Sequence, residues 1–136
     1  MKGKITMKKV NEQSEKITIN VNHVDLGKID LLIDNGFFSN RSDFIRAAIR
    51  NELNKNGSYV EDKIEKKGFV VGIVKYNEDD FQKAIESNQL INLRFIGLFV
   101  IDSNVPLELV KQSVKKIDVK GTLIAPKEIK DYLNSL

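Results

Sequence analysis

The chain has 136 residues, a formal net charge of +3 and no cysteine. The absence of cysteine excludes a disulfide framework, and we expect an intracellular, cytoplasmic protein. No apolar run approaches the ~20 residues that a membrane span needs. No apolar segment of the signal-peptide type follows the N-terminal lysines, so no membrane partner is expected. This length holds one ordinary domain or two small ones.

The net positive charge is carried by the N-terminal part of the chain. Residues 1–56 hold ten Lys or Arg and seven Asp or Glu, a net of +3, whereas residues 57–136 hold twelve of each. Residues 1–14 contain four lysines and few large apolar residues. We interpret this segment as a flexible basic arm whose Lys8 and Lys9 contact a phosphate backbone, and the alternative is a solvated tail.

An alternating octet, Glu-Lys-Ile-Thr-Ile-Asn-Val-Asn, follows at residues 15–22. The pattern predicts a short strand with an apolar, β-branched side and a polar side that suits base edges. A strand this short cannot bury its apolar side alone, and residues 23–67 contain no evident partner. The simplest partner is the same strand of a second copy, and the alternative is an edge strand with one solvated side. The apolar side consists of Ile17, Ile19 and Val21, and the polar side includes Lys16, Thr18 and Asn20.

Two helices are predicted after the octet. Residues 25–35 carry an apolar stripe that Gly36 closes in the manner of a C′ glycine. Asn40 is a good N-cap for a second helix, with Asp43 at the capping-box position. The second helix presents one apolar face, formed by Phe44, Ile45, Ala48, Ile49 and Leu53.

A strand, a helix, a turn and a capped helix within residues 14–54 resemble the ribbon-helix-helix family of DNA-binding proteins, the MetJ, Arc and CopG-like group. The resemblance is carried by Lys-Ile-Thr-Ile-Asn-Val-Asn at 16–22, by Gly36, and by Asn-Arg-Ser-Asp-Phe-Ile-Arg at 40–46. It covers the N-terminal third of the chain. It implies an intertwined homodimer whose paired strands lie in the DNA major groove.

The resemblance also implies roles for individual residues. Lys16, Thr18 and Asn20 would contact bases of a pseudo-palindromic operator. The start of the second helix would hold a phosphate through Asn40, Arg41 and Ser42. The dimer core would contain Ile17, Ile19, Val21, Ile45 and Ile49. Several dimers could assemble on one DNA.

The second half begins with a polar stretch at residues 55–67, which we interpret as a linker or as a frayed continuation of the second helix. Residues 68–136 then contain three similar strand-like runs, with Gly72, Gly97 and Gly121 spaced 25 and 24 residues apart. Each run leads into a helix-like stripe: one around Phe81, one from Leu107 to Ile117, and one from Ile129 to Leu136. This period indicates three β-α units with parallel strands.

The β-α units weakly resemble a short leucine-rich-repeat-like solenoid, and a compact three-stranded α/β sandwich is the rival arrangement. No unit can bury its apolar face alone, so the three must stack or pair with another subunit. We therefore expect this half to support assembly or to bind a protein partner. A folded appendage that only stabilises the dimer is the simpler alternative.

Few residues suit catalysis or metal binding. His23 is the single histidine, cysteine is absent and no glycine-rich phosphate loop occurs. The acidic triplet 78–80 is placed where it would start a helix. We therefore predict no enzyme activity, no cofactor and no metal site, and we assign His23 to a cap or to the surface.

Together these patterns predict an α+β protein with an N-terminal ribbon-helix-helix domain and a small C-terminal α/β domain. The predicted function is a dimeric, sequence-specific transcriptional regulator such as a repressor. One alternative is an antitoxin-type autoregulator whose C-terminal half binds a toxin. The other is a dimeric protein-binding scaffold without specific DNA binding.

Overall fold

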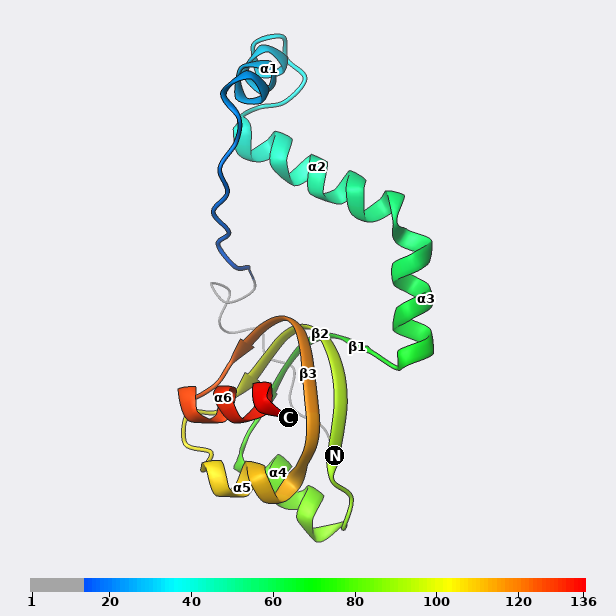
Figure 1. The fold of residues 1–136 in the computed structure, drawn as a ribbon, viewed down its shortest axis with the longest axis vertical. Helices are drawn as coiled ribbons and strands as arrows, with labels where there is room; N and C mark the ends of the chain where they lie inside the picture. The colour runs from blue at the N-terminus through cyan, green and yellow to red at the C-terminus, as the bar shows by residue number, and fades with distance from the viewer. Residues whose placement is uncertain (1–13) are drawn as a thin grey trace. The chain divides into compact units, whose positions relative to one another are not determined.

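The structure, a computed structural model, describes residues 14–136 (Figure 1). It contains six α-helices and one three-stranded sheet among these residues, which confirms the predicted α+β class. The chain divides into two compact units. The N-terminal unit is Lys16–Lys63, and the C-terminal unit is Ile64–Leu136, to which Ser14 and Glu15 also belong.

Helix α1 (His23–Asp34) begins and ends at polar caps. The side-chain oxygen of Asn22 accepts hydrogen bonds from the amides of Val24 and Asp25, at 2.8 and 3.3 Å. Gly36 follows the helix with φ of +82°, and its amide and that of Phe37 bond back to the last turn. Gly36 is therefore the C′ residue of a Schellman turn, as its position in the sequence predicts.

Helix α2 (Arg41–Lys55) begins at Asn40, as predicted. The side-chain oxygen of Asn40 accepts from the amide of Asp43 at 2.8 Å. The Asp43 carboxylate accepts in turn from the amide of Ser39 at 3.0 Å, one residue before the usual partner in a capping box. The helix is thus fixed at its start by two reciprocal bonds that satisfy free backbone donors.

Residues 57–67 form a third helix, α3 (Gly57–Lys67), which is separated from α2 by Asn56. Gly68, with φ of +72°, ends α3 through a turn of the same kind as the one after α1. The polar stretch, which the sequence analysis interpreted as a linker or as a frayed continuation of the second helix, therefore forms a separate helix in the structure.

The sheet contains β1 (Val70–Tyr76), β2 (Ile91–Ile101) and β3 (Val114–Ile124), all parallel and in the order β1-β2-β3. A helix follows each strand: α4 (Glu78–Glu86), α5 (Leu107–Ser113) and α6 (Lys127–Ser135). Gly72 pairs with Gly97, and Gly97 with Gly121, so the three glycines of the predicted alignment lie side by side across the sheet.

Two of the three glycines, Gly97 and Gly121, leave no room for a side chain. Gly97 has φ of +134° and Gly121 has φ of +117°, conformations that residues with a Cβ rarely adopt. A Cβ on Gly97 would overlap the carbonyl oxygen of Gly72, and one on Gly121 would overlap that of Gly97. Gly97 and Gly121 are therefore required by the backbone of the neighbouring strand, whereas the space beside Gly72 is open within the described part of the chain.

One prediction about this half was wrong. The apolar stripe from Leu107 to Ile117 does not continue as one helix, because α5 ends at Ser113 and β3 starts at Val114. Val114 pairs with Ile91, and Ile117 with Leu93. The β-branched residues at the start of β3 pack better in the sheet than in a continued helix.

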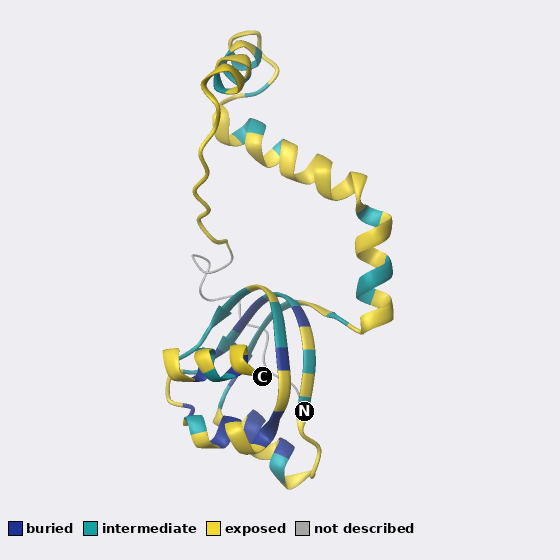
Figure 2. Ribbon diagram, in the orientation of Figure 1, coloured by how far each residue is buried: buried dark blue, intermediate teal, exposed yellow. Residues whose placement is uncertain are grey.

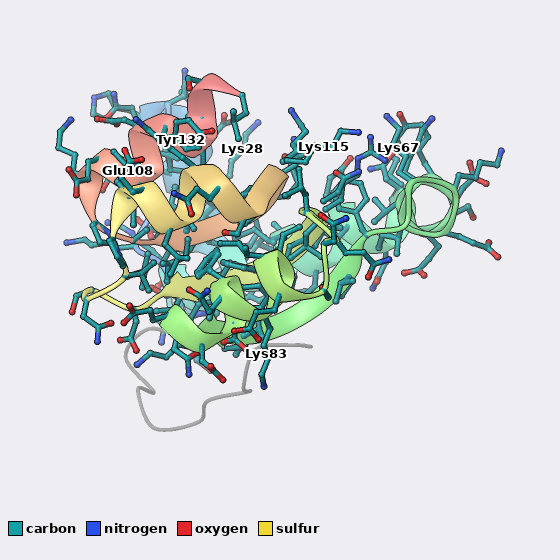
Figure 3. All side chains as sticks on the ribbon, turned by 90° about the horizontal axis from the view of Figure 1, so that it is seen from below. Lys28, Lys67, Lys83, Glu108, Lys115 and Tyr132 are labelled. Carbon is teal, nitrogen blue, oxygen red and sulfur yellow. The ribbon has the colours of Figure 1, made fainter. Side chains whose placement is uncertain are left out.

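The core of the C-terminal unit lies between one face of the sheet and the three helices that follow its strands (Figure 2). At its centre Tyr76 contacts Phe81 and Phe99, with ring centroids 5.6 and 4.9 Å apart, and Phe95 meets Phe99 at 5.4 Å. Asp80 of α4 is buried, whereas the other charged residues of this helix are exposed. Lys83 of α4 points outward in Figure 3 and pairs with Asp79 at 3.4 Å.

Candidate nucleic-acid interface

The predicted base-reading segment is exposed along its whole length. Residues 15–22 belong to no helix or strand in this single chain, and all are exposed. Ile17 exposes 78% of its surface and Ile19 exposes 62%. Lys16, Thr18 and Asn20 are exposed as well, so both sides of the alternating segment are accessible to a partner.

The apolar faces of the two helices are also incompletely covered. Neither α1 nor α2 contains a buried residue, and in Figure 2 both helices are yellow and teal, without dark blue. Ile45 and Ile49 of the predicted dimer core are exposed, together with Leu53 one turn later. Phe38 and Phe44 form an aromatic contact in this unit, with ring centroids 5.1 Å apart. The N-terminal unit alone therefore has almost no hydrophobic core.

The start of α2 provides hydrogen-bond donors for an anion. Asn40 uses its side-chain oxygen for the cap, which leaves its amide nitrogen outside that bond. Ser42 is exposed in the first turn. The free backbone amides of a first turn attract phosphate, although the acidic side chain of Asp43 also lies there.

Arg41, the third predicted phosphate contact, has a partner that the sequence analysis did not identify. Its Nε and Nη2 donate to the two carboxylate oxygens of Asp30 on α1, at 3.0 and 2.9 Å. The hydrogen bond from Arg41 lowers the pKa of Asp30, and the same bond raises the pKa of Arg41. Both side chains are exposed, so the pair remains accessible to solvent and to a competing anion.

Other cations of the N-terminal unit are less engaged. Within residues 14–136, Lys28, Arg46 and Arg50 take part in no ion pair. Arg46 and Arg50 lie four residues apart on α2 and so share one side of the helix. Lys8 and Lys9, predicted as further phosphate contacts, lie outside the described residues.

Few features of the described chain suit a metal or a membrane. No group of three or more His, Asp or Glu side chains that could hold a metal occurs among residues 14–136. His23 is the exposed first residue of α1. No helix among these residues is both long and apolar enough to cross a bilayer.

A comparison with known protein families matches residues 12–130 to the Ribbon-Helix-Helix transcriptional regulator family. The chain belongs to this family. The match extends far beyond the N-terminal third that carried the sequence resemblance, and it includes the C-terminal sheet, α4, α5 and the start of α6. No curated protein and no solved structure matches the chain significantly. The family is one of transcriptional regulators.

Proposed function

We propose that this ribbon-helix-helix protein is a cytoplasmic, dimeric transcriptional regulator that binds specific DNA sequences. The observation that carries the proposal is the exposed alternating segment at residues 16–22, in a unit whose helices bury no side chain. The uncovered apolar side of this segment favours burial against a partner, and its uncovered polar side is available for hydrogen bonds to DNA.

The apolar side is assigned to a second copy of the chain. Two copies of residues 16–22 would pair as an antiparallel ribbon, and Ile17, Ile19 and Val21 would be covered by the helices of the dimer. Ile45 and Ile49 would contribute to the same intertwined core. Burial of a large aliphatic side chain stabilises by roughly 1.5–3 kcal/mol, so several such residues from each copy would suffice for a stable dimer.

The polar side is assigned to the DNA major groove. Lys16 would donate to guanine, Asn20 would bind adenine through two hydrogen bonds, and Thr18 would contact a thymine methyl or a base edge. A two-fold symmetric ribbon requires a pseudo-palindromic operator.

Phosphates would be held at the start of α2 by Asn40, Arg41 and Ser42, and by Lys8 and Lys9 of the arm. Contacts of this kind fix the position of the protein on the duplex and do not read sequence. Because Asp30 already binds the edge of Arg41 formed by Nε and Nη2, a phosphate at this edge would compete with a carboxylate.

The C-terminal unit is assigned to assembly or to binding a protein partner. Its three strand-helix segments form one core with one face of the sheet, and the other face contributes no residue to that core. Its edge strands β1 and β3 each pair on one side only among the described residues. Higher-order assembly of dimers on DNA would use this unit.

The function is tested by selecting bound fragments of genomic DNA at near-physiological salt. The wild type is compared with the variant Lys16→Ala/Thr18→Ala/Asn20→Ala. A matched control, Gln112→Ala/Lys115→Ala/Asn134→Ala, removes one lysine and two other exposed polar side chains from the C-terminal unit. We expect the wild type and the control to enrich one short palindrome, and the first variant to enrich none.

Loss of the three base-reading side chains should reduce discrimination by roughly 1–3 kcal/mol each. If the first variant enriched the same palindrome, these three residues would not be the ones that read the DNA sequence. Binding without any motif and without a steep salt dependence would favour the scaffold alternative. The antitoxin alternative predicts a C-terminal half that folds only with its target, and the well-packed core around Phe81 and Phe99 argues against it.

A further inference from the structure

The two outer strands of the sheet present different edges. Neither β1 nor β3 has a neighbour on its outer side within the part of the chain that the structure describes (Figure 1). Four of the eleven residues of β3 are charged, a feature that keeps free strand edges from pairing, whereas Lys75 is the single charged residue of β1. Val70 and Val71 of β1 expose 51% and 61% of their surface. The β1 edge is therefore apolar and open to a partner strand.

Val70 stands at this edge on the core side of the sheet. It pairs with Phe95 of β2, and paired residues of neighbouring strands point to the same face. Phe95 is buried in the core, whereas Val70 is half exposed because β1 is the outermost strand of the described sheet. Val70 thus extends the apolar layer of the core beyond the edge of the sheet.

A cavity lies at the opposite edge, on the same side of the sheet. It has a volume of about 210 Å³ and is lined by Val119 and Leu123 of β3 and by Leu133 of α6, together with polar residues of both elements. Val119 pairs with Phe95, so it lies in the same row across the sheet as Val70. A cavity of ~150 Å³ can hold a benzene ring, so this one has room for the side chain of a valine.

The backbone has a matching pair of edges. The carbonyl oxygen of Gly72 lies where a Cβ of Gly97 would be, and the carbonyl oxygen of Gly97 lies where a Cβ of Gly121 would be. Gly72 also has a positive φ, +153°, but the corresponding place beside it is open among the described residues. A further parallel strand with a glycine in register would fill that place with its carbonyl group. Gly121 is the glycine of this set with no strand beyond it in the described sheet.

We propose that β1 of one copy of the chain adds to β3 of a second copy, parallel to it and with Gly72 beside Gly121. In this register Val70 lies beside Val119 of the second copy and enters the cavity between β3 and α6. The proposal rests on the assembly role assigned to the C-terminal unit and names the partner for it. It does not rest on DNA binding.

The register brings no like charges together. Lys75 of β1 lies beside Ile124 of the second copy, and Lys120 of the second copy lies beside Val71. The contact is also head-to-tail, because each copy offers one edge of each kind, so it can continue from copy to copy.

A second copy is favoured as the partner because both halves of the fit belong to this chain. The protruding valine and the open place beside Gly72 are at the β1 edge, and the cavity and the outermost glycine are at the β3 edge. Two β1 edges that met each other would leave the cavity empty. Head-to-tail pairing fills it and covers both edges.

The test is disulfide cross-linking between full-length chains that each carry one introduced cysteine, since the natural chain has none. Four variants are made: Val70→Cys, Val74→Cys, Val119→Cys and Leu123→Cys. They are mixed in pairs without DNA and oxidised with glutathione disulfide, and the linked peptides are identified by mass spectrometry. Circular dichroism of each variant confirms that it is folded.

Two of the mixtures are in the proposed register and two are not. The pairs 70 with 119 and 74 with 123 face each other, whereas 70 with 123 and 74 with 119 are offset by four residues, or ~13 Å along the strand. A disulfide needs Cα atoms within about 7 Å, so we expect the in-register mixtures to cross-link at least about tenfold faster. Equal rates in all four mixtures would overturn the proposal, and so would links found only between two copies of Val70→Cys.

The cross-linking and the selection of genomic DNA fail separately. A wild type that selects a palindrome, with no in-register cross-links in the variants, would contradict the strand pairing alone. In-register cross-links in a protein that selects no palindrome would support the strand pairing and contradict the proposed DNA binding.

Discussion

Arg41 and Asp30 join the two helices of the N-terminal unit through a pair of parallel hydrogen bonds, 3.0 and 2.9 Å long. The guanidinium uses one edge, formed by Nε and Nη2, for a single carboxylate, which is the geometry that also suits a phosphate. The Arg41 side chain thus binds Asp30 of its own chain and, on the proposed function, would also bind a DNA phosphate. Two predictions follow from this competition.

Asp30→Asn is expected to strengthen DNA binding several-fold and to steepen its salt dependence by about one ion, because Arg41 becomes free for a phosphate. Sequence preference should not change. Affinity is measured across a salt series, with Asp34→Asn as the control, since it removes the same charge from the same helix without a described bond to Arg41. Weaker DNA binding by Asp30→Asn would mean that Asp30 holds Arg41 in the orientation in which it contacts the phosphate.

The carboxyl group of Asp30 is expected to titrate below the ordinary range, because Arg41 stabilises its charged form. A pKa that is lower in the folded than in the unfolded state contributes stability above about pH 4, and this is lost as the pH falls through the folded pKa. NMR titration of the Asp30 carboxyl carbon should show its pKa rise in Arg41→Gln. Lys28→Gln should leave the pKa of Asp30 unchanged. If the pKa of Asp30 rose in Lys28→Gln as well, the overall positive charge near α1, and not the direct bond to Arg41, would set it.

Gly97→Ala is expected to destabilise the C-terminal unit severely, by about 3 kcal/mol or more, since the added methyl overlaps a neighbouring backbone oxygen that cannot move freely. Gly27→Ala is the contrasting variant, because it lies in α1 with open space around it. That change should stabilise helix α1 by roughly 0.5–1 kcal/mol. Denaturant unfolding gives the free energy of unfolding of both variants. A small loss of this free energy in Gly97→Ala would show that the backbone of the neighbouring strand can shift to make room for the methyl group.

Ile49→Asp is expected to abolish dimer formation and, with it, operator binding, because it places a charge in the proposed apolar interface. Asn51→Asp introduces the same charge two residues away, at an exposed position outside the apolar stripe, and should leave the dimer intact. Sedimentation analysis of both variants makes the comparison. A dimeric Ile49→Asp protein would place the interface elsewhere.

Local signals in the sequence predicted much of this structure. The helix ends at Gly36 and Asn40 follow from side-chain and backbone preferences within a few residues. The spacing of the three sheet glycines predicted which residues face one another across the strands, because each strand-helix segment has nearly the same length. These features depend on short stretches of chain, which is why a single sequence reveals them.

Features that depend on distant residues could not be predicted in this way. Asp30 and Arg41 meet only because a tight turn places two helix ends together, and Glu15 meets Thr122 across 107 residues. The boundary between α5 and β3 was missed because Val114 and Ile117 satisfy a helical period and a strand equally well. Pairing with β2 decides between the two, and that partner is not visible in the local pattern.

The lack of buried side chains in α1 and α2 has a consequence for gene control. If the protein is a dimer as proposed, a newly made copy cannot form the DNA-binding ribbon until it pairs with a second copy. When dimers are scarce, operator occupancy then rises with the square of the number of copies in the cell. A twofold change in synthesis would change occupancy about fourfold in that regime, so the weak core of a single chain would turn a graded supply of protein into a sharper response.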